Sequence, residues 1–223
     1  MHPSAIRPEI IARVTARRGR LHPYDSLDAR RTALIVIDMQ NAFVAPGAPI
    51  EVPGARAIVP AINRLAAVLR SRGAPVIWVL HENTPDGRDW ERFFGVFVRP
   101  ENRAAAARAL AAGSELQKLW PELELGAGDI RLAKNRYSAL IPGASRLGAV
   151  LNDHRIDTLL IAGTKTNVCC ESTARDAMML DYKVVLLSDC TAALSDEEHR
   201  GTLENVIQQF GDVLSVDEVL ERL

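Results

Sequence analysis

Cys169 is the residue whose type and position best suit nucleophilic chemistry. The short apolar run Thr158–Ala162 predicts a strand buried on both faces, and the next stretch, from Val168 to Leu180, has a helical pattern. Thr166 and Asn167 are good N-cap residues, which places the thiol in the first helical turn. There, free backbone N–H groups and the positive end of the helix dipole favour a thiolate. The alternative is a structural thiol, because most such cysteines pack as small buried apolar side chains.

Asp38 and Lys134 each follow another predicted strand. The apolar run 33–37 ends at Asp38, and the shorter run 130–133 ends at Lys134. Because the carboxyl ends of parallel strands meet along one edge of a sheet, both side chains are expected to converge with Cys169 in one crevice. A carboxylate there can accept the thiol proton, and an ammonium group can stabilise the anion that forms. A lysine alone at a strand end would otherwise be solvated.

Three segments of the chain carry a resemblance to a known family, in the family's order and spacing: 33–43, 134–138 and 163–177. From about Thr32 to the C-terminus the sequence resembles the isochorismatase-like cysteine hydrolases, which include nicotinamidases, N-carbamoylsarcosine amidohydrolase and ureidoacrylate amidohydrolases. The segments around Lys134 and Cys169 look most similar to the ureidoacrylate branch. The resemblance implies that Asp38, Lys134 and Cys169 form a catalytic triad.

The resemblance also implies an oxyanion hole and a reaction. In the family a non-proline cis peptide precedes the nucleophile; carried over, it joins Thr164 and Lys165, and the backbone N–H groups of Lys165 and Cys169 bind the oxyanion. Asp38 would accept the thiol proton, protonate the leaving nitrogen and later activate the water that hydrolyses a thioester. The implied reaction is hydrolysis of a small-molecule C–N bond, in a primary carboxamide or an N-carbamoyl (ureido) group.

Other functions stay open. A nicotinamidase-like or isochorismate-type hydrolase of another substrate is one alternative, although some isochorismate hydrolases lack the cysteine that this chain keeps. A thiol redox role for Cys169 and Cys170 is disfavoured, because adjacent cysteines bridge only through a strained ring and no C-x-x-C motif is present. A non-catalytic binding protein is the third alternative. The family often has Val at position 170, so Cys170 has no assigned role, and Cys190 is expected to be structural.

Several side chains near the expected crevice are candidate substrate contacts: Gln40, Asn41, Phe43, His81, Trp90 and Tyr137. His81 ends the predicted strand 75–80, and it is equally consistent with an ordinary strand-end histidine. Metal-dependent nicotinamidases place an Asp and two His close together just after this strand. No second His follows here, so we expect no metal site and no other cofactor.

The segment 82–129 is the least regular part of the chain. It gathers aromatic residues into the stretch 90–97, including Trp90, Phe93, Phe94 and Phe97. Loops above a strand-end crevice commonly form lids. The segment is therefore expected to be either a lid over the crevice or a contact between subunits.

These residues require a chain of alternating strands and helices to position them. The predicted strands are 33–37, 75–80, 130–133, 158–162, 184–188 and 213–214. The predicted helices are 55–72, 102–112, 144–153, 168–180, 196–210 and 217–223, with Ser195 and Glu198 forming a capping box and 189–191 forming a loop. The alternation predicts an α/β fold: a three-layer α-β-α sandwich around a mostly parallel, six-stranded open sheet.

Composition limits the partners and the location. The 27 Lys and Arg nearly balance the 28 Asp and Glu, so the net charge of -1 gives no general attraction to nucleic acid or an anionic membrane. The three cysteines do not fit a disulfide framework, and no apolar run is long enough to cross a bilayer. We therefore expect a cytoplasmic protein whose partner is a small-molecule amide or ureido substrate.

The first residues differ from the rest of the chain. Residues 1–31 form a basic arm before the hydrolase-like domain 32–223, and Pro8 is placed to start a helix that runs to Arg18. The arm is expected to pack on its own domain or on a neighbouring subunit. The resembling family is commonly dimeric or tetrameric, so a homodimer or homotetramer is expected.

Overall fold

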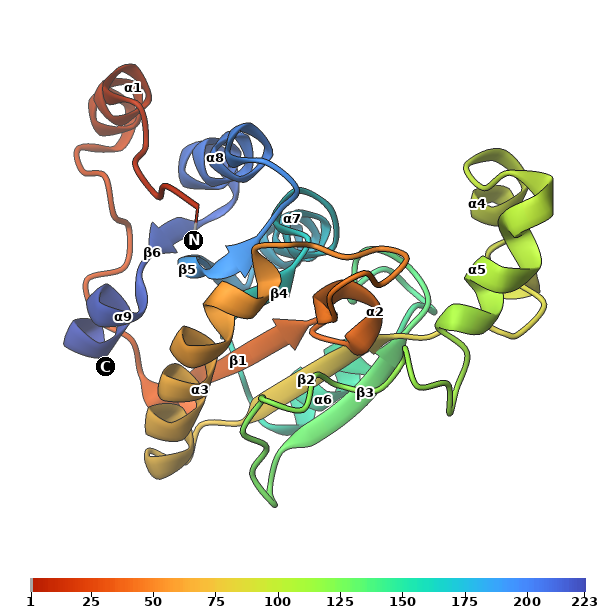
Figure 1. Cartoon of the computed structure of the whole chain (residues 1–223). Coiled ribbons are helices and arrows are strands. Elements are labelled where there is room, and N and C mark those ends of the chain that lie inside the picture. The colour runs from red at the N-terminus through yellow and green to blue at the C-terminus, as the bar shows by residue number, and fades with distance from the viewer. Residues whose placement is uncertain (1) are drawn as a thin grey trace.

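The computed structural model describes residues 2–223, which form one central sheet with helices on both faces (Figure 1). The six strands lie in the order β3-β2-β1-β4-β5-β6, and every neighbouring pair is parallel. Their bounds are β1 (Thr32–Ile37), β2 (Val76–His81), β3 (Ile130–Lys134), β4 (Thr158–Thr164), β5 (Lys183–Ala192) and β6 (Asp212–Leu214). The predicted α/β sandwich is therefore confirmed, with a sheet that is parallel throughout.

The α-helices are α1 (Pro8–Arg18), α2 (Asn41–Val44), α3 (Ala55–Ser71), α4 (Glu91–Val96), α5 (Arg103–Ala109), α6 (Leu147–Asp153), α7 (Glu171–Met179), α8 (Asp196–Asn205) and α9 (Val216–Arg222). Short 3-10 turns occur at η1 (Ala29–Arg31), η2 (Arg88–Trp90) and η3 (Pro100–Asn102). Two π-helical turns, η4 (Thr166–Cys170) and η5 (Val206–Phe210), adjoin α7 and α8. Within the described residues no helix has the length and apolar character needed to span a bilayer.

The central strand β1 explains why the strands are continuous apolar runs in the sequence. Leu34 and Val36 belong to the core shared with α2, α3 and α9, whereas Ala33, Ile35 and Ile37 belong to the core shared with α1, α6, α7 and α8. Alternate side chains thus enter opposite cores, and both faces of the strand exclude water. A strand with this pattern lies inside a sheet that is covered on both sides.

Two local predictions are wrong. Residues 189–191 are not a loop, because β5 continues to Ala192 beside β4 after a register shift. Polar side chains there have partners: the Thr191 hydroxyl donates to the Leu187 carbonyl at 2.9 Å, and the Asp189 carboxylate accepts the Val216 N–H at the start of α9 at 3.1 Å. The predicted helix 102–112 is shorter than expected, because a 3-10 turn precedes it and α5 ends at Ala109.

The capping prediction for α8 is confirmed only in part. The Ser195 hydroxyl accepts the Glu198 N–H at 3.2 Å, as expected for an N-cap. The Glu198 carboxylate accepts the N–H of Leu194 at 3.1 Å and does not bond the Ser195 N–H, so the box is not closed. A complete capping box forms instead at the start of α9, between Ser215 and Glu218.

The N-terminal arm packs on its own domain in this chain. Its helix α1 lies against η5 and begins with Pro8 in the first turn, as predicted. The Arg7 guanidinium binds the buried Glu204 carboxylate, with Nε 2.8 Å from Oε1, and the Arg13 guanidinium donates to the Gln208 side chain at 3.0 Å. The basic residues of the arm therefore contact polar groups of the α8–η5 segment.

Candidate active site

The candidate site lies where the chain reverses its direction across the sheet. From β1 the chain moves outward through β2 to β3, and it then returns to the other side of β1 as β4. A crevice opens at the carboxyl ends of the strands on either side of such a switch point. Asp38, His81 and Lys134 lie at the ends of β1, β2 and β3, and His81 is paired directly with Lys134.

Asp38 and Lys134 form a fully buried ion pair. The Lys134 Nζ donates to Asp38 Oδ2 at 2.9 Å, and both side chains have 0% of their surface exposed. The same ammonium donates to the Arg136 carbonyl at 3.1 Å and lies 3.2 Å from His81 Nδ1. An ammonium group has three N–H donors, so each of them has a partner. The buried charge is thereby fully compensated.

The backbone holds Asp38 in an uncommon conformation. Its φ of 54° lies in the left-handed region, which Asp tolerates better than most residues. Its N–H donates to the Val79 carbonyl at 2.9 Å, and its own carbonyl accepts the Thr164 hydroxyl at 2.9 Å. Asp38 Oδ1 is buried and has no hydrogen-bond partner among residues 2–223. The carboxylate therefore keeps one oxygen available to take up a proton.

The thiol of Cys169 shares this environment. Burial raises its pKa above the ordinary value for cysteine, the negative charge of Asp38 raises it further, and the positive charge of Lys134 opposes both effects. Burial also raises the pKa of the Asp38 carboxyl, which Lys134 and Cys169 act to lower. Burial by itself lowers the pKa of Lys134, but the charges of Asp38 and Cys169 outweigh it and raise the pKa. The resting state is therefore a neutral thiol beside an ion pair.

The sequence prediction for Cys169 is confirmed in part: the residue lies in the first turn of the helical segment, but that turn is π-helical, and the raised pKa of the thiol contradicts a resting thiolate. Cys169 lies in the π-helical turn η4, and α7 begins only at Glu171. Neither Thr166 nor Asn167 is the cap residue; the Thr166 hydroxyl is instead 3.0 Å from His199 Nδ1. A π turn widens the helix locally, and apolar periodicity does not distinguish it from an α-helical turn.

The turn before Cys169 brings backbone groups to the same place. The peptide bond between Thr164 and Lys165, which the family resemblance places in cis, is cis. The Lys165 carbonyl accepts the N–H groups of Val168 and Cys170, at 3.1 and 3.2 Å. Lys165 and Cys169 both line the cavity described below, so their backbone lies beside the space that a substrate would fill.

Gly163 makes this arrangement possible. Its φ of +111° is one that residues with a side chain rarely adopt. A Cβ at this position would lie 2.0 Å from the carbonyl oxygen of Ile37. Only glycine lets β4 approach β1 so closely at the end that carries the site.

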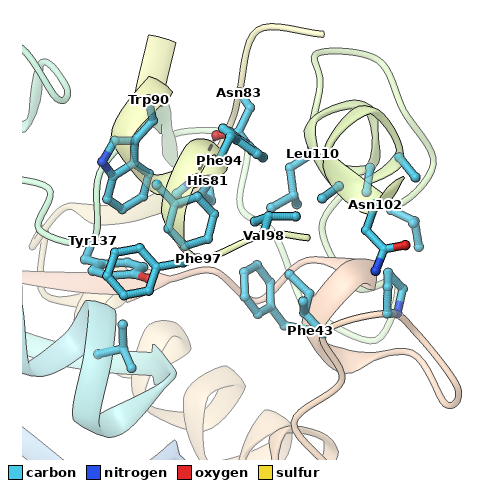
Figure 2. Close-up of a pocket in the computed structure, with 18 of the residues that line it drawn as sticks. Phe43, His81, Asn83, Trp90, Phe94, Phe97, Val98, Asn102, Leu110 and Tyr137 are labelled. Carbon is cyan, nitrogen blue, oxygen red and sulfur yellow. Dashed lines mark hydrogen bonds between the residues drawn. The ribbon is translucent and has the colours of Figure 1, made fainter. Parts of the chain in front are cut away.

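A cavity of about 770 Å³ opens beside these residues. Helices α4 and α5 project beyond the carboxyl ends of the strands (Figure 1). Side chains of both helices line the outer side of the cavity (Figure 2). Cys169, Lys165 and Val168 contribute the inner side, next to the sheet. The thiol therefore meets a space that can hold a small molecule.

Four of the candidate substrate contacts line this cavity: Phe43, His81, Trp90 and Tyr137. The aromatic residues of the segment 90–97 form one wall, in which the rings of Trp90 and Phe93 stack 4.7 Å apart. Tyr137 meets Trp90 edge-on at 4.8 Å. In this structure the aromatic stretch is thus part of the cavity wall.

His81 is neutral in this setting. Burial, together with the charge of Lys134, lowers its pKa to about 3. Its Nδ1 accepts from the Lys134 ammonium, so Nε2 carries the hydrogen and donates to Asn83 Oδ1 at 3.0 Å. His81 therefore orients neighbouring groups and carries no positive charge.

Gln40 and Asn41 lie elsewhere, contrary to the expectation that they contact substrate. The Gln40 amide bridges the backbone of His81, donating to its carbonyl at 2.9 Å and accepting its N–H at 2.7 Å. The Asn41 amide donates to the Glu115 carbonyl at 2.8 Å. Neither side chain lines the cavity. Their role here is to hold the segment 114–118 and the end of β2 together.

Two polar side chains of the cavity, Asn83 and Asn102, were not predicted from the sequence. Asn83 comes just past the end of β2, so its position after a strand was a usable signal. Asn102 ends a 3-10 turn in the outer wall, where no pattern in the sequence indicates a site.

The other cysteines are separate from the cavity. Cys170 and Cys190 are both buried and free, and the Cys170 thiol lies 3.8 Å from the Ala162 carbonyl. Across residues 2–223, no group of three or more His, Cys, Asp or Glu side chains could hold a metal ion. The site itself presents a thiol, a carboxylate, an ammonium group and backbone N–H groups.

Comparison with known proteins places this site in context. The Isochorismatase domain matches residues 32–218 of the chain. A protein of Arabidopsis thaliana named "probable inactive nicotinamidase" is 35% identical over 175 residues, covering 78% of this chain and 87% of that protein. Ureidoacrylate amidohydrolase RutB of Methylobacterium radiotolerans is 33% identical over 205 residues, covering 86% of this chain and 79% of that protein. The crystal structure of a cysteine hydrolase from Pseudomonas syringae pv. phaseolicola is similar with a TM-score of 0.80 and 31% identity, covering 88% of this chain and 93% of that one.

Proposed function

Because the chain belongs to the isochorismatase family of hydrolases, we propose that it cleaves a C–N bond of a small molecule through a thioester on Cys169. The bond belongs to a primary carboxamide or an N-carbamoyl group. The similarity to a ureidoacrylate amidohydrolase supports this class of bond. The observation that carries the proposal is the buried pair of Asp38 and Lys134, 2.9 Å apart, beside a cysteine that lines a ligand-sized cavity.

The first half of the reaction forms the thioester. The Cys169 thiol keeps its proton at rest because its pKa is raised, so the proton passes to Asp38 as the sulfur attacks the carbonyl carbon. Asp38 Oδ1 suits this transfer because it is buried and has no other partner among the described residues. The same proton then moves to the leaving nitrogen, and the C–N bond breaks. Lys134 offsets the negative charge that remains near the sulfur.

The oxyanion of each tetrahedral intermediate requires hydrogen-bond donors. The N–H groups of Lys165 and Cys169 serve this purpose, since both residues line the cavity beside the sulfur. Loss of one such donor has cost about 3 kcal/mol in a comparable enzyme. Hydrolysis follows when Asp38 takes a proton from water, which attacks the thioester, and the proton returns to the departing sulfur.

Ammonia release from a panel of primary amides and ureido acids tests the proposal. Cys169→Ser is expected to lower kcat/KM by about a thousandfold or more, because an alcohol is a weaker nucleophile than a thiol in the same place. Cys170→Ser is the matched control and should keep activity, since the second thiol lies outside the cavity. Mass spectrometry of acid-quenched wild-type enzyme should detect the acyl group on Cys169.

Two results would contradict the assignment. Full activity in Cys169→Ser would show that Cys169 is not the nucleophile. Loss of activity only in Cys170→Ser would show that Cys170 is the nucleophile instead. One relative is named inactive, so binding without turnover is the competing function. Tight binding of an amide by an enzyme that releases no ammonia and forms no acyl adduct would favour that competing function.

A further inference from the structure

Helix α8 bonds to the segment that carries the nucleophile on both sides of the sulfur. Before Cys169, the Thr166 hydroxyl lies 3.0 Å from His199 Nδ1. After Cys169, the Thr202 hydroxyl donates to the Glu171 carboxylate at 2.6 Å. All of these side chains are buried, so the two bonds lie in surroundings of low dielectric and are stronger than they would be in water. The backbone around the sulfur is therefore tied to α8.

The bond to Thr166 also fixes the backbone that borders the cavity. Lys165 stands between Thr166 and Thr164, whose hydroxyl donates to the Asp38 carbonyl at 2.9 Å. Buried side-chain bonds therefore hold Lys165 from both neighbours. In a preorganised site a displacement of the reacting groups by about 1 Å can cost about a hundredfold in rate. A group that holds Thr166 thus acts on the reaction without touching the substrate.

The ring that holds Thr166 is neutral and inaccessible to solvent. His199 has 0% of its surface exposed. Burial lowers its pKa to about 4, and the adjacent His2 adds to this effect. The ring of His2 is stacked on that of His199, with centroids 4.8 Å apart and an angle of 21° between the planes. His2 therefore covers one face of the ring that bonds the nucleophile turn.

Polar contacts fix His2 at the start of α8. Its Nε2 accepts the Ala193 N–H at 3.1 Å, and its Nδ1 lies 2.7 Å from the Asp196 carboxylate. These two partners stand on either side of Ser195, which is the N-cap residue of α8. Both nitrogens of the ring are thus engaged, and 12% of the side chain is exposed. His2 is therefore held in one orientation against His199.

The arm that carries His2 also contacts the other end of α8. There the Arg7 guanidinium binds the buried Glu204 carboxylate, with Nε 2.8 Å from Oε1. Figure 1 shows the start of the arm beside α8. The arm precedes residues 32–218, which match the Isochorismatase domain. A segment outside the matched domain thus holds the helix that holds the nucleophile turn.

We propose that the N-terminal arm positions the nucleophile: His2 is a positioning residue that acts through His199 and Thr166 on the turn that carries Cys169. In the described part of the chain, the lining of the cavity includes none of the first three side chains. The arm therefore contributes to the rate of the chemical step and not to the binding of substrate. This inference rests on the proposed hydrolase function of the same site.

Steady-state kinetics of His2→Ala test the arm. The probe is whichever of butyramide and N-carbamoyl-β-alanine the wild type hydrolyses faster. His2→Ala should lower kcat about threefold to tenfold and change KM by less than about twofold, because the lost contact acts on the turn and not on the substrate. His2 belongs to neither hydrophobic core, so its truncation leaves both cores intact. Arg13→Ala is the matched control: it removes a contact of the arm with Gln208 and should leave kcat unchanged.

Two substitutions of Thr166 distinguish positioning from packing. Thr166→Val keeps the shape of the side chain and removes the hydroxyl that meets His199, and it should lower kcat about tenfold. Thr166→Ser keeps the hydroxyl and should retain most of the wild-type kcat. Since His2 acts through the same contact, His2→Ala should have little further effect in the Thr166→Val background. A larger loss in Thr166→Ser than in Thr166→Val, or fully additive effects, would overturn the inference.

Hydrogen exchange followed by mass spectrometry separates this inference from the hydrolase function. The amides of residues 164–170 include those of Val168 and Cys170, which donate to the Lys165 carbonyl. They should exchange at least about threefold faster in His2→Ala than in the wild type or in Arg13→Ala. If the wild type releases no ammonia from any amide, the hydrolase function fails, and faster exchange still supports the positioning of the turn by the arm. Unchanged exchange in His2→Ala, or an equal change in Arg13→Ala, would overturn the inference whatever the activity.

Discussion

Replacing Lys134 with methionine would leave the Asp38 carboxylate buried without its positive partner. Both side chains are entirely inaccessible to solvent, and the ammonium also serves the Arg136 carbonyl and His81. Removing one member of a buried ion pair costs about 3–5 kcal/mol of unfolding free energy. For a chain of 223 residues each kcal/mol lowers the melting temperature by about 2–4 °C, so Tm should fall by about 6–20 °C.

The loss should depend on pH, because Asp38 can avoid the buried charge by taking up a proton. Burial already raises the pKa of Asp38, and removal of Lys134 raises it further. A carboxyl whose pKa is higher in the folded than in the unfolded chain favours folding when it is protonated. The deficit relative to the wild type should therefore be small in acid. It should grow as the pH rises through the raised pKa of the folded variant and be constant above it.

Calorimetry or urea unfolding of three variants between about pH 5 and pH 8 checks this reasoning. Asp38→Asn/Lys134→Met removes both charges and should regain at least about half of the stability that the single variant loses. Lys183→Met removes an exposed lysine whose nearest carboxylate oxygen is 4.0 Å away, and it should change stability by about 0.5 kcal/mol or less. The electrostatic account would be refuted by a Lys134→Met variant as stable as Lys183→Met, or by a double variant no more stable than Lys134→Met alone.

Other perturbations have equally definite outcomes. Gly163→Ala should lower the free energy of unfolding by at least about 3 kcal/mol in urea, because its Cβ would enter the β1 backbone. Gly143 also has a positive φ but has open space around it, so Gly143→Ala should lower the free energy of unfolding by about 1 kcal/mol. Equal losses in the two variants would contradict the steric account. The pH profile of kcat/KM should contain no step from His81, whose pKa is about 3. If the profile instead has a step near pH 6.5 that disappears in His81→Asn, the lowered pKa of His81 would be refuted. Arg7 lowers the pKa of the Glu204 carboxyl in the folded chain, so Arg7→Met should lower Tm at neutral pH. The deficit should shrink as the pH falls below the ordinary pKa of glutamate and through the lowered pKa of the folded carboxyl; a pH-independent loss would argue against the pair.

The strands and the positions of the reactive side chains could be predicted from the sequence. Each strand of the inner sheet is buried on both faces, so its residues form an uninterrupted apolar run. Asp38 stands at the end of such a run, and Lys134 ends the edge strand β3, whose residues 130–133 alternate between half-buried and exposed. The parallel arrangement brings these strand ends to one edge. The family resemblance added the pairing of these residues with Cys169.

The local backbone geometry at Cys169 could not be predicted from the sequence in the same way. The residues 166–170 satisfy the criteria for a capped α-helix, yet they form a π turn, in which the Thr166 hydroxyl bonds His199 from another segment. Asn41 and Gln40 follow β1 closely, and distant backbone carbonyls at Glu115 and Gln117 turn their amides away from the cavity. In each case the partner lies far away along the chain.

The sequence by itself determined the order of strands and helices and the residues able to do chemistry, since these depend on periodicity and on the residue types that end each apolar run. Tertiary structure alone decided the protonation state of Cys169 and the shape of the cavity. The pKa of the thiol results from its burial beside Asp38 and Lys134, and the aromatic wall results from the placement of α4 and α5 beyond the sheet. Burial and electrostatic interaction depend on distances in space, which separation along the chain does not specify.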